Sequence, residues 1–173
     1  MKIFKSLIGF FILTVTLNAS GQDNCSFKID TAKILANINL DTLLSEFQIE
    51  SFKVSTDKKD MPHFIKKQLN CLTHGFSIAN PGQLYQNTDV IVQKLPSRQL
   101  IFLAKSKNMF VMTYQMGVMG LPRKILIIKI KDKTIIDFWS GQGFEDLDTK
   151  RHIVDYLKQN LNTKKLNTNM IYF

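Results

Sequence analysis

Few residues in this sequence are able to do chemistry, and the clearest candidates are its three histidines and two cysteines: His63, His74, His152, Cys25 and Cys71. Cys71 and His74 stand at i and i+3, which places them on one side of a predicted helix as half of a possible zinc site. A closed zinc site takes four ligands, and Cys25 with Asp23 or a remote carboxylate would have to supply the rest. His63 lies ~16 Å along the helix from His74, too far to share one metal ion. We therefore expect no metal and no cofactor.

A nucleophile with a nearby histidine is the second kind of chemistry to consider. Ser140 lies in the glycine-containing stretch 139–143, with His152 and Asp155 downstream. The stretch lacks the glycine two residues before the serine that a hydrolase elbow requires, so we interpret it as a glycine-rich exit from the last strand. An envelope hydrolase using Ser140 or Cys71 with a histidine stays an alternative. Whether the chain is an enzyme is left open, with the balance against it.

The first 21 residues decide how the cysteines are interpreted. Lys2 and Lys5 precede an apolar run from Leu7 to Leu17, and Ala19 and Gly21 place small side chains before a cut at Gln22. This layout is typical of a secretory signal peptide. The run is shorter than the ~20 residues of a membrane-spanning helix, although an uncleaved anchor is the competing interpretation. We predict a cleaved signal, a periplasmic or secreted protein, and no membrane span after cleavage.

In an oxidising compartment, one pair of cysteines indicates one disulfide. We therefore predict a Cys25–Cys71 bond, with two free thiols or a metal site as the alternatives. The bond would tie the start of the mature chain to a central helix.

The formal charge of +9 does not predict nucleic-acid binding. Only Arg98, Arg123 and Arg151 are arginine, the residue that bidentate phosphate and base recognition favours. The lysines are spread along the chain without the interleaved aromatic residues of a base-stacking surface. We interpret them as solvated faces, and binding of anionic lipid or glycan through lysines is a further alternative.

The elements expected to position these residues indicate an α+β domain. An antiparallel β-meander of four to five strands is packed by two to three α-helices and preceded by the signal peptide. We expect residues 22–161 to form a single globular domain and 162–173 a C-terminal tail. The four main strands are 99–105, 109–115, 124–131 and 134–139, with weaker candidates at 51–55 and 89–93. The helices are 30–38, 41–47, 62–73 and 149–161, with Asp30, Asp41, Asp60 and Asp148 at or near their starts.

The run 99–105 is apolar on both alternations, so we expect it to be covered on both faces. The aromatic end of the chain raises an outer-membrane barrel as an alternative. The short strands and large helical share argue against it.

The most unusual segment is residues 114–123, which joins the second and third main strands. It combines glycine and proline, which predict a loop, with apolar residues that suit adaptable contacts. We propose it as a protein-binding surface that Tyr85 extends if the two loops converge, and the alternative is a loop folded over the core. The predicted partner-binding residues are Met116, Val118, Met119, Leu121, Arg123 and Tyr85.

The function expected from the sequence is therefore that of a small exported, non-catalytic binding domain. Its partner would be another envelope or extracellular protein, and the binding could serve a neutralising or inhibitory role. A small-molecule or lipid carrier, with a pocket between sheet and helices, is the other alternative.

Overall fold

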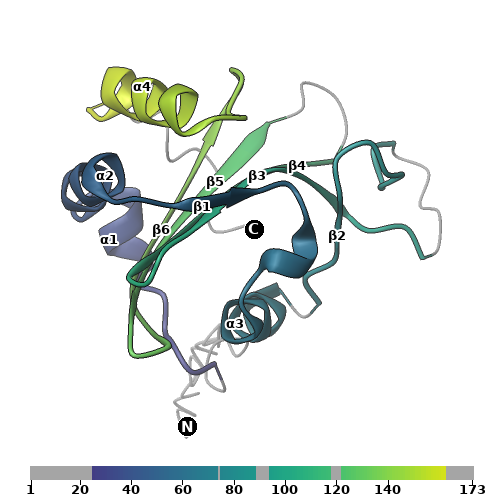
Figure 1. Cartoon of the computed structure of the whole chain (residues 1–173), viewed down its shortest axis with the longest axis horizontal. Helices are drawn as coiled ribbons and strands as arrows, with labels where there is room; N and C mark the ends of the chain where they lie inside the picture. The colour runs from purple at the N-terminus through teal and green to yellow at the C-terminus, as the bar shows by residue number, and fades with distance from the viewer. Residues whose placement is uncertain (1–24, 74, 89–93, 118–121, 163–173) are drawn as a thin grey trace, which may run out of the picture.

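A computed structural model describes residues 25–73, 75–88, 94–117 and 122–162 of the 173 residues. Its elements form an α+β fold (Figure 1). In chain order they are α1 (Thr31–Leu35), α2 (Leu40–Ile49), β1 (Lys53–Ser55), the 3-10 helix η1 (Lys58–Asp60), α3 (His63–Thr73), β2 (Ile78–Ala79), β3 (Arg98–Lys105), β4 (Met109–Met116), β5 (Arg123–Lys131), β6 (Thr134–Gly143) and α4 (Lys150–Asn160). None of the helices in these ranges is long and apolar enough to cross a membrane.

The sheet is the predicted antiparallel meander, in the order β1-β3-β4-β5-β6. In register, Val111 of β4 lies opposite Ile127 of β5, which lies opposite Trp139 of β6. Short strands extend the sheet beyond β3: β1 pairs antiparallel with the end of β3, and β2 pairs parallel with its start. β2 was not predicted from the sequence, because a strand of two residues is too short to show a β pattern.

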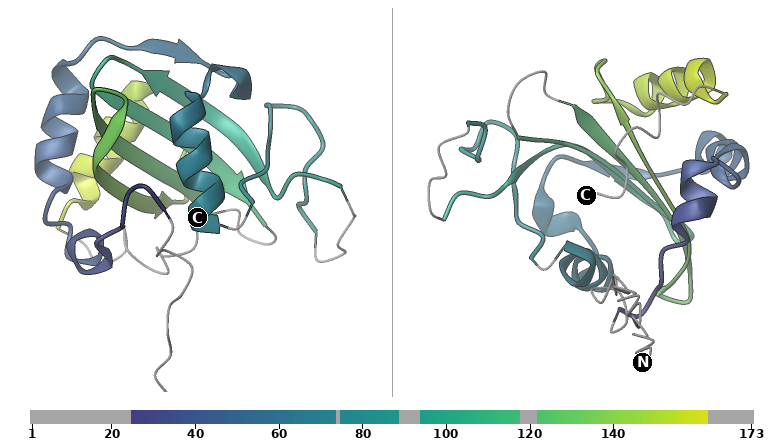
Figure 2. Two further views of the ribbon diagram at one scale, coloured as in Figure 1. Left: turned by 90° about the horizontal axis from the view of Figure 1, so that it is seen from below. Right: turned by 180° about the vertical axis from the view of Figure 1, so that it is seen from behind.

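Helices cover both faces of the sheet. α3 lies across one face, and α1, α2 and α4 lie against the other (Figures 1 and 2). Strand residues of both alternations are therefore buried, including Leu100, Phe102, Leu103 and Ala104 of β3. This confirms the prediction that the apolar run in β3 is covered on both sides.

The structure corrects the prediction for residues 139–143, which continue β6 instead of leaving the sheet. Gly141 is in the strand because the Trp139 ring occupies the space above it: a Cβ there would lie 2.0 Å from Trp139 Cη2. A Cβ on Gly143 would lie 2.8 Å from the Tyr156 ring of α4. The two glycines thus make room for packed aromatic rings within a strand. Glycine in a strand often marks such a close approach.

Two helix starts also differ from the prediction. Thr149, not Asp148, caps α4, with its hydroxyl accepting from His152 N, while Asp148 pairs with the His152 ring. α2 begins at Leu40, so Asp41 lies in its first turn rather than at the cap. The cap at Asp30 is confirmed, because its carboxylate accepts from Lys33 N.

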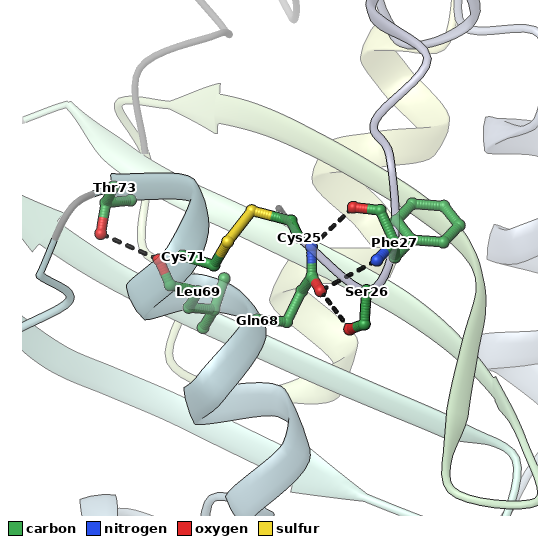
Figure 3. Close-up of a disulfide and its surroundings, with 7 residues drawn as sticks. All are labelled: Cys25, Ser26, Phe27, Gln68, Leu69, Cys71 and Thr73. Atoms are coloured by element: carbon green, nitrogen blue, oxygen red, sulfur yellow. Dashed lines mark hydrogen bonds between the residues drawn. A yellow bond between two sulfur atoms is a disulfide. The ribbon is translucent and has the colours of Figure 1, made fainter. Parts of the chain in front are cut away.

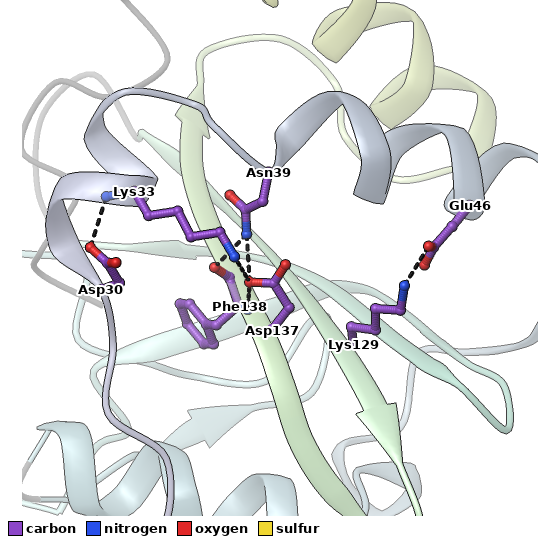
Figure 4. A network of polar contacts seen from close by, with 7 residues as sticks. All are labelled: Asp30, Lys33, Asn39, Glu46, Lys129, Asp137 and Phe138. Atoms are coloured by element: carbon purple, nitrogen blue, oxygen red, sulfur yellow. Dashed lines mark hydrogen bonds and ion pairs between the residues drawn. The ribbon is translucent and has the colours of Figure 1, made fainter.

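The outer edge of β6 is closed by side chains, as Figure 4 shows. Asn39 Nδ2 donates to the Phe138 carbonyl at 3.2 Å and to Asp137 Oδ1 at 2.7 Å. The same Asp137 oxygen accepts from Phe138 N and from Lys33 Nζ, and Tyr156 Oη donates to the Gln142 carbonyl. An exposed edge strand is a template for pairing with another chain. These contacts protect β6 from such pairing.

The predicted Cys25–Cys71 disulfide is present, with the two Cα atoms 5.7 Å apart (Figure 3). It joins the segment before α1 to the last turns of α3. Beside it, the buried Gln68 side chain accepts from Ser26 Oγ at 2.7 Å and from Phe27 N at 3.1 Å, and donates to Phe27 O at 2.7 Å. The N-terminal segment is thus attached to α3 by one covalent bond and three hydrogen bonds.

Candidate functional site

Three of the predicted partner-binding residues are described by the structure, and these three lie at one end of the sheet. Tyr85 is buried, Met116 is half-buried against the core, and Arg123 donates to Glu145 O and pairs with Asp146. The hydrogen bond from Arg123 lowers the pKa of Asp146. Val118, Met119 and Leu121 lie outside the described residues.

Tyr85 lies beside the end of β4 that leads into the second loop. Burial raises the pKa of Tyr85, and a side-chain hydrogen bond with Gln115 partly opposes this effect. Gln115 is the register partner of Arg123 and the neighbour of Met116. Tyr85, Met116 and Arg123 are therefore grouped at the same end, although Tyr85 offers little exposed surface.

The residues of the hydrolase alternative are not brought together. Ser140 is buried and alternates with Trp139 and Gly141, which face α1 and α4, so its side chain faces the α3 side. His152 is exposed on α4, on the other side of the sheet, where it contacts Asp148 at 2.7 Å. Cys71 is in the disulfide and is not a free thiolate. Asp155 pairs with Arg151, four residues earlier.

The disulfide also removes Cys25 and Cys71 from the zinc alternative, and His74 lies outside the described residues. Across the ranges that the structure describes, no group of three or more His, Cys, Asp or Glu side chains is arranged to hold a metal ion.

A recess that the sequence analysis did not identify lies where η1 and α3 meet the segment leading into β2. Its volume is about 340 Å³. Its floor is apolar and its rim carries three lysines; it is lined by Lys58, Lys59, Met61, Lys66, Phe76, Ser77, Ile78 and Pro96. In sequence these lysines are indistinguishable from the other solvated lysines, because only the fold brings η1, α3 and residues 76–78 together.

The carboxylates nearest to the recess are engaged elsewhere. Asp57 accepts from Lys59 N and Asn80 Nδ2, and Asp60 accepts from Ser55 Oγ and Lys105 Nζ. These hydrogen bonds lower the pKa of both carboxyls, with the bond from Lys59 N dominant for Asp57 and that from Ser55 dominant for Asp60. Neither carboxylate lines the recess, although Asp57 interacts electrostatically with Lys59 at its rim.

Lys58 is the most constrained of the three lysines, because its Nζ donates to the Ile78 carbonyl at 3.0 Å across the recess. Lys59 and Lys66 are exposed. The arrangement is suited to binding a ligand that combines a negative group with an apolar part.

Comparisons with known proteins add no family to this description. The chain matches no protein-family model, and neither a curated protein nor a solved structure is significantly similar to it.

Proposed function

We propose that the chain is an exported, non-catalytic binding domain whose ligand is an organic anion with an apolar part, held in the recess between η1, α3 and residues 76–78. The observation that carries the proposal is the lining of this recess: three lysines surround an apolar floor, and no lining residue is acidic. Ligand sites are commonly concave and mainly apolar, with a few polar groups that orient the ligand.

Two features support the export part of the proposal. The first 21 residues have the layout of a secretory signal. The disulfide joins Cys25, soon after that segment, to α3, and such bonds persist in oxidising compartments. Intact-mass analysis of the native protein tests this part. A species that begins at Gln22 with both sulfurs bonded is expected, and a species that retains Met1 with both sulfurs free contradicts export.

Calorimetric titration with three probes tests the ligand class. Octanoate combines charge with a hydrocarbon chain, acetate has the charge alone, and octanol has the chain alone. We expect octanoate to bind at least tenfold more tightly than either of the others. Equal binding of octanol would show that the lysines do not contribute, and equal binding of acetate would show that the apolar floor does not.

Two neighbouring lysines provide a matched pair of variants. Lys66 lines the recess, whereas the adjacent Lys67 is exposed and does not. Loss of one partly exposed charge from an ion pair corresponds to about 1 kcal/mol, or roughly fivefold in affinity. Lys66→Gln is therefore expected to weaken octanoate binding by roughly that factor, while Lys67→Gln leaves it unchanged. Equal effects of the two variants would contradict the recess as the site.

The protein-partner function remains as a second proposal, because Tyr85, Met116 and Arg123 are grouped at one end of the sheet. Its test is the double variant Met116→Ser/Met119→Ser in a pull-down from envelope extract. Loss of a captured protein with unchanged thermal stability supports this surface. Unfolding of the variant would instead assign the loop to the core.

A further inference from the structure

A second polar cluster lies on the α3 side of the sheet, inside the fold. Tyr114 of β4, Lys124 of β5 and Gln142 of β6 are register partners, so their side chains form a row across three strands. Register partners on adjacent antiparallel strands have Cβ atoms roughly 5 Å apart. We refer to these three residues as the inner row. Lys124 is the second residue of β5, which places the row near the end of the sheet.

Among the described residues, none supplies an opposite charge to the buried Lys124. The residue is 7% exposed, and its Nζ donates to Gln142 Oε1 at 2.9 Å. Within the described ranges, no acidic residue forms a salt bridge with it. Burial lowers the pKa of Lys124, and no carboxylate opposes that effect. A buried ammonium is normally paired with an acid, and a single neutral amide does not replace that pairing.

Tyr114 provides a second buried donor. Its side chain is fully buried, and none of the described groups accepts a hydrogen bond from its hydroxyl. The Arg98 guanidinium interacts with the hydroxyl oxygen, which partly opposes the effect of burial on the pKa. Burial raises the pKa of Tyr114 to about 12, so the hydroxyl keeps its proton. Most buried polar side-chain atoms in folded proteins have a partner. Tyr114 and Lys124 are register partners, so the same row holds a buried hydroxyl that lacks an acceptor and a buried ammonium that lacks a described carboxylate. Both groups can donate to an anion.

Arg98 increases the positive charge near the inner row. It is 5% exposed, and its guanidinium carbon lies 4.6 Å from the Phe76 ring centre and 5.9 Å from that of Tyr114. Phe76 also lines the recess and packs edge-on against Tyr114 at 5.8 Å. Its ring therefore lies between the recess and the inner row.

We propose that the inner row is an anion-binding site, in which Lys124 Nζ and Tyr114 Oη donate to a carboxylate or phosphate group and Gln142 orients the ammonium. The group supplies the acceptor atoms and the negative charge that the described neighbours of this row lack. The inference does not depend on the ligand proposed for the recess.

Thermal unfolding of the full chain tests the inference. Phosphate and acetate are titrated separately at constant ionic strength, with chloride as the reference salt. A ligand that binds only the native state raises the unfolding temperature with its concentration. Stabilisation by phosphate alone, by acetate alone or by both supports the site and identifies the group that it prefers. No stabilisation by either anion relative to chloride overturns it.

The variants locate the effect. Lys124→Met is expected to weaken the anion response at least tenfold in apparent affinity, and Lys124→Gln repeats the test with a polar side chain of similar length if the methionine variant does not fold. Lys131→Met is the control, because Lys131 is exposed on the same strand. Tyr114→Phe is expected to weaken the response as well. A Lys124 variant that responds like the unmodified chain overturns the inference.

The recess variant separates the two proposals. Lys66→Gln should lose affinity for octanoate and retain the response of the inner row to phosphate or acetate. If Lys66→Gln abolishes the response to the small anions, the anion lies in the recess and the inner row is not the site. If the unmodified chain responds to the small anions but does not bind octanoate, the proposed function is wrong and the inference about the inner row still holds.

Discussion

The disulfide permits the most quantitative prediction. Replacing both Cys25 and Cys71 with alanine releases a loop of sequence separation 46 in the unfolded chain. In the chain-entropy treatment, a loop of this size corresponds to about 4 kcal/mol of stability at 25 °C. Urea unfolding measures it: with a slope of about 2 kcal/mol per molar, the midpoint should fall by ~2 M. A loss below about 1 kcal/mol would refute the entropic reasoning.

A variant of Gln68 tests whether the disulfide stabilises the protein by restricting the unfolded chain or by holding the native contact in place. Its three hydrogen bonds to Ser26 and Phe27 hold the same segment without the sulfurs, and the side chain is 1% exposed. Gln68→Ala should cost about 2–3 kcal/mol. If the disulfide acts through the unfolded state, that cost is the same with and without the bond, within about 0.5 kcal/mol. A much smaller cost in the alanine double variant would show that the segment detaches when the bond is absent.

Three further predictions follow from other parts of the sheet. Gly141→Ala should cost at least ~3 kcal/mol in urea unfolding, because the new Cβ would overlap the buried Trp139 ring; a cost under 1 kcal/mol would mean that the ring moves freely. Asn39→Leu removes the hydrogen bonds from Asn39 Nδ2 to the Phe138 carbonyl and to Asp137, so about 2 kcal/mol should be lost. Concentration-dependent association should then appear in size-exclusion chromatography. The raised pKa of Tyr114 means that the native state holds its proton more tightly than the unfolded state. The contribution of this hydroxyl to stability is therefore complete below pH 10 and falls by about 3 kcal/mol as the pH rises through 12, a loss that Tyr114→Phe should not show.

The sequence predicted those features of the fold that depend on local patterns. The main strands, α3 and the Asp30 cap follow from alternation, spacing and residue type. The extent of β6 was missed, because glycines at 141 and 143 indicate a loop when considered alone. Only the positions of Trp139 and Tyr156 in space explain why small residues belong there.

The candidate sites were missed for a related reason. Lys58 and Lys66 are on different elements, and the recess exists only after η1 and α3 pack beside residues 76–78. The inner row is set by strand register, which places Lys124 between Tyr114 and Gln142. Periodicity shows that a lysine lies within a strand, but it does not show which residues lie across from it. The hydrolase alternative shows the converse, because residues that are close in sequence lie apart in space. Ser140 and His152 are twelve residues apart in sequence but lie on different sides of the sheet.

Basic residues on the two faces of the sheet differ in their partners, and this difference connects the two proposals. On the side of α1, α2 and α4, three basic residues have carboxylate partners: Lys33 with Asp137, Lys129 with Glu46, and Arg123 with Asp146. Lys150 of α4 donates instead to two backbone carbonyls. On the α3 side Lys105 pairs with Asp60. Within the described part of the chain, Lys124 donates only to the Gln142 amide, and no acidic residue lines the recess. Lys124 lies inside the fold, where a charge without an opposite partner lowers stability. The two proposals therefore share one argument: each places an anion where the described lining or neighbours supply no acidic side chain.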